Sequence, residues 1–527
     1  MGGFVIKDKI VRIFNYIFIL FFSIIFINCI FFNKKSVIDF NMKAVLIISI
    51  LFFIVCLVMY LCISKNKDKI SAFIQNKKLR LIIIIAALLV LTIQIIIARC
   101  FYYPVGWDVE ILRESAKALA CNEEVNYLYF QQFPNNVFLL WVFKYIYYIS
   151  SIFPKLDYEF ALVIFNIIIM DLGVLMTILI SKKIYGLKLS ILTGMLCTIL
   201  VIFSPWMNVV YSDTIGLFFP VLILYLYIKI NDCAKFKNKI ILSILIGGSS
   251  VIAFQVKPTN IIVLIAIFIS IFFYKMNNKE EVFKYIGIIV CIMLSFVIGK
   301  YIYNNSIGNI DVCGQKLDDN YSVVVPSTHF LMMGMQEQYN EDNQAYTYGS
   351  WCQSDYFYTF SFFGKQEKIQ AHISEIKNRL SNLGIKGYMK FLYNKANWIL
   401  HDGTFYYGGE GGFVYEQPSA SNKFAEKIQE YYVPTNSGYV NIAYIYEGIW
   451  VVILLLIILS FRNKQNQREE IFILKLTITG IIIFLLLFEA RSRYLINHLP
   501  IFILLSVYGF QGIVRKMNSS IKFFKNK

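Results

Sequence analysis

The feature that most limits how this chain can fold is a series of long apolar runs with few charged side chains. A helix needs about 20 apolar residues to cross the hydrocarbon core of a bilayer, and backbone polar groups there must bond internally. We expect about twelve membrane-spanning helices, over residues 13–32, 44–63, 81–98, 159–180, 189–205, 213–230, 240–256, 259–274, 284–303, 444–461, 471–488 and 494–514. The sequence therefore predicts an all-α polytopic membrane protein.

The composition agrees with a chain that lies mostly in lipid. Hydrophobic residues make up 58% of the sequence and charged residues only 16%, whereas soluble domains average about 45–50% apolar and about 25% charged residues. These values argue against a water-soluble globular protein. The first apolar run is too long for a signal peptide and lacks a small-residue cleavage site, so we expect it to remain as an anchor.

The placement of basic residues predicts the orientation of the chain. With the N-terminus inside, the segments expected in the cytoplasm carry 27 Lys and Arg residues, and the short outer segments carry 11. Cytoplasmic loops are rich in Lys and Arg, and a loop as long as 304–443 does not report orientation. We expect a multi-pass protein of the plasma membrane with both termini in the cytoplasm. The net charge of +17 reflects these loops and does not indicate nucleic acid binding.

Two long segments outside the membrane divide the chain into three parts. Residues 1–303 are expected to form a transmembrane module with an outer loop at 99–158. Residues 304–443 are expected to form an α-containing extracytoplasmic loop domain, and residues 444–527 supply the last helices and a basic cytoplasmic tail.

One further apolar stretch, residues 136–153, is not counted as a span. It carries Lys144 and is rich in Tyr, Phe and Trp, which suits a helix that lies in the plane of the membrane interface. If it crossed the membrane, the basic cluster at 182–188 would lie outside, against the charge rule. A true span at 136–153 remains the competing interpretation.

The cysteines and histidines do not form a metal-binding pattern. The sequence has ten cysteines without a Cys-x-x-Cys pair, and its four histidines are widely scattered, so no structural zinc site is expected. Cys313 and Cys352 are both expected on the outer side and either pair across the long loop or remain as thiols, since their spacing does not enforce a disulfide.

Acidic residues at the membrane face are the first candidates for chemistry, because ionisable groups there are costly. Asp108 and Glu110 follow the third expected span, and Asp213 lies at the outer end of the sixth. The alternative is that Asp108 caps a helix over 109–120 and that Asp213 caps its own span, since Asp is a common N-cap residue.

Basic residues at the same face are the second group of candidates. Lys257 lies in a very short outer connection, and Arg491 and Arg493 lie where the last span begins. The charge rule disfavours basic residues there, so an anionic partner such as a phosphate would explain them. The alternatives are contacts with lipid headgroups and an ion pair between Glu489 and one of the arginines.

Taken in order, these segments resemble a known enzyme family. The matching residues are Gly106-Trp107-Asp108, Tyr129-Phe130-Gln131-Gln132-Phe133-Pro134-Asn135-Asn136, Tyr211-Ser212-Asp213-Thr214, Lys257-Pro258-Thr259, Thr328-His329-Phe330 with Met332-Met333-Gly334, and Arg491-Ser492-Arg493-Tyr494. The chain resembles the GT-C fold integral-membrane glycosyltransferases, which include the protein O-mannosyltransferases and the aminoarabinose transferases of lipid A. It is most similar to Gram-positive bacterial enzymes of this type. The resemblance covers most of the chain from about residue 80.

The sequence departs from this family in two places. Two extra spans precede the acidic loop, which in many relatives follows the first span. Val109 separates Asp108 from Glu110, whereas the mannosyltransferases have an adjacent Asp-Glu pair, and this leaves the role of Glu110 in doubt.

The resemblance implies transfer of a sugar from a polyprenyl-phosphate donor to an acceptor at the cell surface, which is a glycan, a lipid or a protein. Asp108 would act as general base, with Asp213 and Glu110 in the catalytic group, and a single displacement would invert the anomeric centre. The leaving phosphate is a weak base, so positive donors would stabilise it. No cofactor is implied, although Asp108, Glu110 and Asp213 could together hold a divalent cation.

The resemblance also implies residues that bind the substrates. The donor phosphate would be bound by Lys257, Arg491 and Arg493, and the substrates would contact His329, Tyr211 and Tyr494. Two other functions remain open. A transporter or flippase of lipid-linked sugars would favour broken helices in repeated halves, and a polysaccharide polymerase or ligase would differ in the size of its donor.

Overall fold

The computed structural model describes residues 2–31, 38–153, 157–276, 279–307, 323–341, 345–409, 418–462 and 468–525. The protein is an all-α polytopic membrane protein. Ten helical segments in the described part are long and apolar enough to cross a membrane, namely Lys9–Phe31, Met42–Lys65, Leu81–Cys100, Tyr158–Tyr185, Ser212–Asp232, Phe236–Val256, Lys279–Ser306, Tyr439–Leu459, Glu469–Leu487 and Ser492–Asn518.

These segments coincide with ten of the twelve expected spans. The other two expected spans, 189–205 and 259–274, correspond to the shorter apolar helical segments Leu187–Ile202 and Pro258–Tyr274. The stretch at 136–153 forms α7 (Val137–Ser151), which has 15 residues. A helix of this length is too short to cross the hydrocarbon core upright, and α7 is not among the ten spans.

The first half of the chain is a series of helices joined by short connections. The α-helices are α1 (Gly2–Phe31), α2 (Met42–Lys65), α3 (Lys67–Gln75), α4 (Lys77–Cys100), α5 (Trp107–Ala120), α6 (Leu128–Gln132), α7, α8 (Tyr158–Tyr185), α9 (Leu187–Cys197), α10 (Ser212–Ile215), α11 (Phe218–Asp232), α12 (Phe236–Val256), α13 (Ile262–Tyr274) and α14 (Lys279–Ser306). Short 3-10 or π turns lie between them at η1 (Pro134–Asn136), η2 (Thr198–Ile202), η3 (Pro205–Asn208) and η4 (Pro258–Ile261).

The second half contains the long loop and the last membrane helices. Its elements are α15 (Ser327–Met333), β1 (Glu337–Asn340), β2 (Ala345–Tyr348), α16 (Gln353–Phe360), α17 (Lys365–Leu400), η5 (Tyr407–Gly409), α18 (Lys423–Tyr432), α19 (Tyr439–Leu459), η6 (Ser460–Arg462), α20 (Glu469–Leu487), η7 (Ser492–His498) and α21 (Leu499–Lys525). The two strands pair antiparallel, with Glu337 opposite Tyr348.

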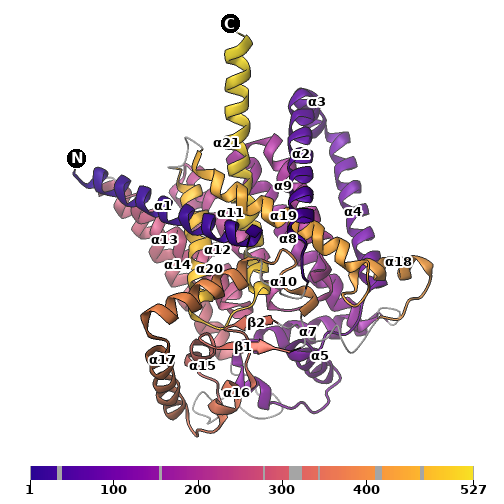
Figure 1. Ribbon diagram of the computed structural model, residues 1–527, viewed down its shortest axis with the longest axis vertical. Helices are drawn as coiled ribbons and strands as arrows, with labels where there is room; N and C mark the ends of the chain where they lie inside the picture. Colours follow the sequence, from indigo (N-terminus) through magenta and orange to yellow (C-terminus); the bar gives the residue numbers. More distant parts are fainter. Residues whose placement is uncertain are drawn as a thin grey trace.

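The helices place the elements of the two long segments between the spans at one end of the molecule. Figure 1 shows both chain ends and α3 toward one end, and α5, α7, α15, α16 and the β1–β2 hairpin toward the other. The two long segments outside the spans therefore meet on the same side. This arrangement brings residues from the first and second halves of the chain to a common site.

Close helix packing fixes the position of the last membrane helices. α19 packs against both α2 and α21, and glycines lie at these contacts. A Cβ atom added to Gly448 of α19 would lie 2.6 Å from Ile48 of α2, and one added to Gly509 of α21 would collide with the Leu456 carbonyl of α19. Small residues permit such close approach of membrane helices, so α21 and the η7 segment that precedes it are held firmly.

Cys313, which could pair with Cys352 or remain a thiol, lies outside the described residues. Cys352 is buried in the loop region, with its Sγ 3.0 Å from the Ser354 hydroxyl.

Candidate active site

Asp108 lies in the first turn of α5 and is not its cap. The helix begins at Trp107, and Gly106 occupies the N-cap position without a side-chain cap. A carboxylate in this turn is favoured by the partial positive charge of the helix N-terminus. Trp107 has a φ of +50°, which is sparsely populated for a residue with a side chain. The backbone thus turns abruptly immediately before Asp108.

Two tyrosines bind the Asp108 carboxylate. The Tyr211 hydroxyl donates to Asp108 Oδ2 at 3.2 Å, and the Tyr129 hydroxyl also bonds Asp108. Asn136 donates to the Tyr129 oxygen at 2.6 Å and orients it. Burial, together with the Asp108 charge, raises the pKa of both tyrosines, so both remain neutral donors. Among the described residues Asp108 forms no ion pair, and its carboxylate is therefore not neutralised by a fixed cation.

Asp213 has a different environment. It lies in α10, is 1% exposed, and forms ion pairs with Lys257 and with Arg493, whose Nε lies 3.7 Å from Asp213 Oδ2. Tyr211, not Asp213, is the N-cap of α10. One carboxylate between two cations leaves a net positive charge. The capping alternative is therefore wrong for Asp213, which anchors the two basic side chains.

Lys257 is held over an aromatic ring by a short connection. Its Nζ lies 4.2 Å from the centre of the Tyr494 ring, within the range of a cation–π interaction. Burial lowers the pKa of Lys257, and the Asp213 charge opposes this effect. The Asn497 amide donates to the Asn260 side chain at 2.7 Å, which ties this connection to η7.

Arg493 links the acidic loop to the basic cluster. Its guanidinium carbon lies 4.2 Å from the centre of the Trp107 ring and 5.4 Å from that of Tyr494. The Trp107 ring in turn meets the Tyr211 ring edge-on, with centroids 5.4 Å apart. The structure thus brings Asp108, Tyr211, Asp213, Lys257, Arg493 and Tyr494 into one connected cluster.

Glu489 adds a second carboxylate near the arginines. It accepts a hydrogen bond of 3.0 Å from the Tyr494 hydroxyl. Burial raises the pKa of Glu489, and the charges of Arg491 and then Arg493 lower it. Arg491 therefore acts on the same cluster through Glu489.

A family model described as "Conserved hypothetical integral membrane protein" matches residues 5–513 of the chain. The chain belongs to this family of integral membrane proteins. The matched range contains both Asp108 and Arg493, so it includes the cluster residues from both halves of the chain. No curated protein and no solved structure matched the chain.

Two of the predicted site residues, Glu110 and His329, lie apart from the cluster. Glu110 is exposed on α5, with its Oε2 on the side of Gly106. His329 is buried, and its Nδ1 lies 2.6 Å from the Thr359 hydroxyl, which also contacts His372 Nε2 at 3.0 Å. Burial lowers the pKa of His329 and of His372 to about 4. This network joins α15, α16 and α17.

A lysine that sequence reasoning missed fixes the segment before η7. The buried Lys395 ammonium of α17 donates to the carbonyls of Gly334 and Phe488, each at 2.6 Å, and of Leu486 at 3.2 Å. Nothing in the local sequence marks Lys395, because its partners come from distant segments. It holds the chain that leads to Glu489 and Arg491 against the loop elements of the integral membrane protein.

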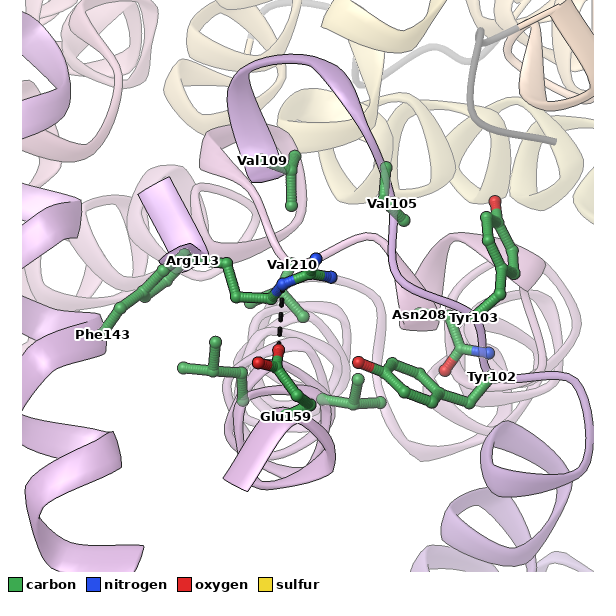
Figure 2. A pocket seen from close by; sticks show the side chains of 11 residues that line it. Tyr102, Tyr103, Val105, Val109, Arg113, Phe143, Glu159, Asn208 and Val210 are labelled. Atoms are coloured by element: carbon green, nitrogen blue, oxygen red, sulfur yellow. Dashed lines mark ion pairs between the residues drawn. The ribbon is translucent and has the colours of Figure 1, made fainter. Parts of the chain in front are cut away.

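A small cavity lies behind α5 (Figure 2). It has a volume of about 20 Å³ and is lined by Val109 of α5 and Val210, whose chain neighbours Asp108 and Tyr211 belong to the cluster. The Arg113 Nε and Glu159 Oε2 atoms form an ion pair of 2.9 Å across it. This volume suits about one water molecule. The ion pair across the cavity joins α5 to α8.

In the part of the chain that the structure describes, no three His, Cys, Asp or Glu side chains gather in a way that could hold a metal ion. Asp108 is bound by tyrosines and Asp213 by cations, and Glu110 is exposed. The three carboxylates considered for a divalent cation therefore have separate environments.

Proposed function

We propose that the protein is a membrane glycosyltransferase that moves a sugar from a polyprenyl-phosphate donor to an acceptor at the cell surface. The site is on the outer face of the plasma membrane, and both termini are in the cytoplasm. The observation that carries the proposal is the carboxylate of Asp108, which forms no ion pair with any described residue and lies next to a cationic cluster formed by Lys257 and Arg493. The resemblance to GT-C enzymes supports this choice of reaction class.

In this proposal Asp108 is the general base. It takes the proton of the acceptor hydroxyl while the hydroxyl oxygen attacks the anomeric carbon of the sugar, which is ordinary base catalysis. Tyr129 and Tyr211 hold the carboxylate by their hydroxyl groups. Because attack and departure occur on opposite sides of the anomeric carbon, one displacement inverts its configuration.

The leaving group is polyprenyl phosphate, which departs as an anion when its bond to the anomeric carbon breaks. Lys257 and Arg493 provide positive charge that Asp213 only partly neutralises, and Arg491 adds to it. Preorganised donors of this kind stabilise developing negative charge. Asp213 is thus a positioning residue for the cations, and no acid is needed to protonate the leaving group.

The test is transfer by the purified full-length protein from polyprenyl-phosphate-linked sugars. Loss of a general base typically slows a reaction by about a hundredfold or more, so Asp108→Asn should reduce transfer by at least that factor at unchanged expression. Glu114→Gln is a matched control, since Glu114 is an exposed carboxylate on the same helix. Mass spectrometry of copurifying lipids identifies the donor.

Two results would count against the proposal. Full transfer by Asp108→Asn would remove this carboxylate from the mechanism. Movement of lipid-linked sugar across liposomes by a protein that transfers none of it would favour the transporter alternative.

A further inference from the structure

A larger cavity lies beside α3, far from the candidate active site. Figure 1 shows α3 at the same end of the molecule as both chain ends. It has a volume of about 250 Å³ and lies between α2, α3, α9 and α21. A water molecule requires only roughly 10–15 Å³ by this kind of measure. The cavity is therefore large enough for a molecular group rather than a single solvent molecule.

The charged residues that line this cavity all have the same sign. Lys67, Lys188 and Arg515 contribute to its walls, and none of the described residues that line it is acidic. Lys188 Nζ lies 5.8 Å from the centre of the Tyr60 ring, which forms another wall. Three like charges around one space repel each other, so an anion in the cavity would relieve an unfavourable arrangement.

The position of the cavity along the spans points to the surface of the membrane. The second span ends at Lys65 and the fourth at Tyr185, so Lys67 and Lys188 directly follow membrane-spanning segments. Tyr60, Tyr185 and Leu189 provide a mostly apolar wall next to the cations. A ligand that carries both a phosphate and an acyl chain satisfies both surfaces, and basic pockets between membrane helices bind such headgroups.

We propose that this cavity is a second anion site, which binds the phosphate headgroup of an anionic phospholipid from the leaflet at this end of the protein. Lys67, Lys188 and Arg515 contact the phosphate, and the apolar wall contacts the glycerol and the start of the acyl chains. The site does not depend on the proposed transfer reaction, since it shares no residue with the cluster around Asp108.

The experiment measures lipid binding to the full-length protein in a neutral detergent. Native mass spectrometry follows titration with dioleoylphosphatidylglycerol, with dioleoylphosphatidylcholine as the zwitterionic comparison. The variant Lys67→Gln/Lys188→Gln/Arg515→Gln is compared with Lys65→Gln/Lys182→Gln/Lys237→Gln, which removes three exposed lysines from the same end of the protein without changing the cavity lining. Because each basic residue near a membrane contributes about 1 kcal/mol to anionic lipid binding, the cavity variant should bind phosphatidylglycerol at least about tenfold more weakly.

The expected result is strong preference for phosphatidylglycerol in the native protein and in the control variant, and loss of this preference in the cavity variant. Equal weakening in both triple variants would overturn the proposal, because it would reflect general surface charge. A separate titration with inorganic phosphate, followed by thermal stability, distinguishes the ligand source. If the ligand is free phosphate, inorganic phosphate would then stabilise the native protein but not the cavity variant, and the lipid would stabilise neither. That result would also overturn the assignment to a phospholipid.

Discussion

The guanidinium carbon of Arg493 lies 4.2 Å from the centre of the Trp107 indole ring, and Trp107 directly precedes Asp108. The contact joins the segment that precedes α21 to the loop that follows α4. A planar guanidinium stacks flat on an aromatic face and can still bind a phosphate bidentately with its edge, whereas an ammonium lacks this forked planar geometry. The orientation of Arg493 therefore depends on Trp107.

This relationship predicts that Arg493→Lys retains the charge but weakens donor binding. The loss of stacking and of the forked hydrogen-bonding geometry should raise the KM for the polyprenyl-phosphate donor by about tenfold. Initial rates at varied donor concentration provide the measurement. Arg99→Lys is the control, since Arg99 is exposed and pairs with Asp157. An unchanged KM in Arg493→Lys would show that the stacked guanidinium does not contribute to donor binding.

The ion pair between Asp213 and Lys257 predicts a partial rescue. Asp213→Asn leaves two buried cations without their carboxylate, and breaking a buried pair in this way costs about 3–5 kcal/mol. Removing the charge of Lys257 as well, in Asp213→Asn/Lys257→Met, should restore part of the stability. Thermal unfolding in detergent measures both variants and the Lys257→Met single variant. Strictly additive losses would mean that the two side chains are not coupled.

The backbone of Trp107 predicts an unusual order of stabilities. At a φ of +50°, a residue with a Cβ atom costs roughly 1–2 kcal/mol more than glycine. Both Trp107→Gly and Trp107→Ala lose the indole ring, so their difference isolates the backbone. Trp107→Gly should be the more stable of the two, in contrast to the usual order within a helix. The reverse order in thermal unfolding would contradict the left-handed conformation.

The pair of buried imidazoles predicts loss of stability in mild acid. Burial lowers the pKa of His329 and His372 to about 4, and both are near 6.5 when the chain is unfolded. Their contribution is therefore fully present above about pH 6.5 and is lost as the pH falls from 6.5 toward 4, because the unfolded state then binds more protons. Hydrogen exchange of α15, α16 and α17 at several pH values measures this change.

The double variant His329→Gln/His372→Gln should show a smaller dependence on pH in this window. His401→Gln leaves the imidazole pair intact and should behave like the native protein. If the native protein, the double variant and His401→Gln lose the same stability in acid, the loss is due to groups other than His329 and His372.

The positions of the apolar helices could be predicted from the sequence because they depend on the length of each apolar run. All twelve expected ranges coincide with apolar helical segments, although 189–205 and 259–274 are shorter than a full span. The helix expected over 109–120 begins at Trp107. Hydropathy is a local property of consecutive residues, and such properties can be read without knowledge of the fold.

The individual contacts of the candidate site could not be predicted in the same way. The sequence marked both Asp108 and Asp213 as candidates, and only tertiary packing distinguishes a carboxylate bound by two tyrosines from one bound by two cations. The interpretation of Asp108 and Asp213 as helix caps was wrong, since Gly106 is the N-cap of α5 and Tyr211 is the N-cap of α10. Lys395 was missed because its acceptors are carbonyl groups, which every residue carries.

The position of η7 near the end of the chain has a consequence for biosynthesis. Chains fold from the N-terminus as they are made, so α5 and α10 are synthesised well before Arg491 and Arg493 leave the ribosome. A chain that stops before residue 490 has the carboxylates of the site without its two arginines. Under the proposed function, the donor phosphate site with both arginines is therefore complete only when synthesis is almost finished.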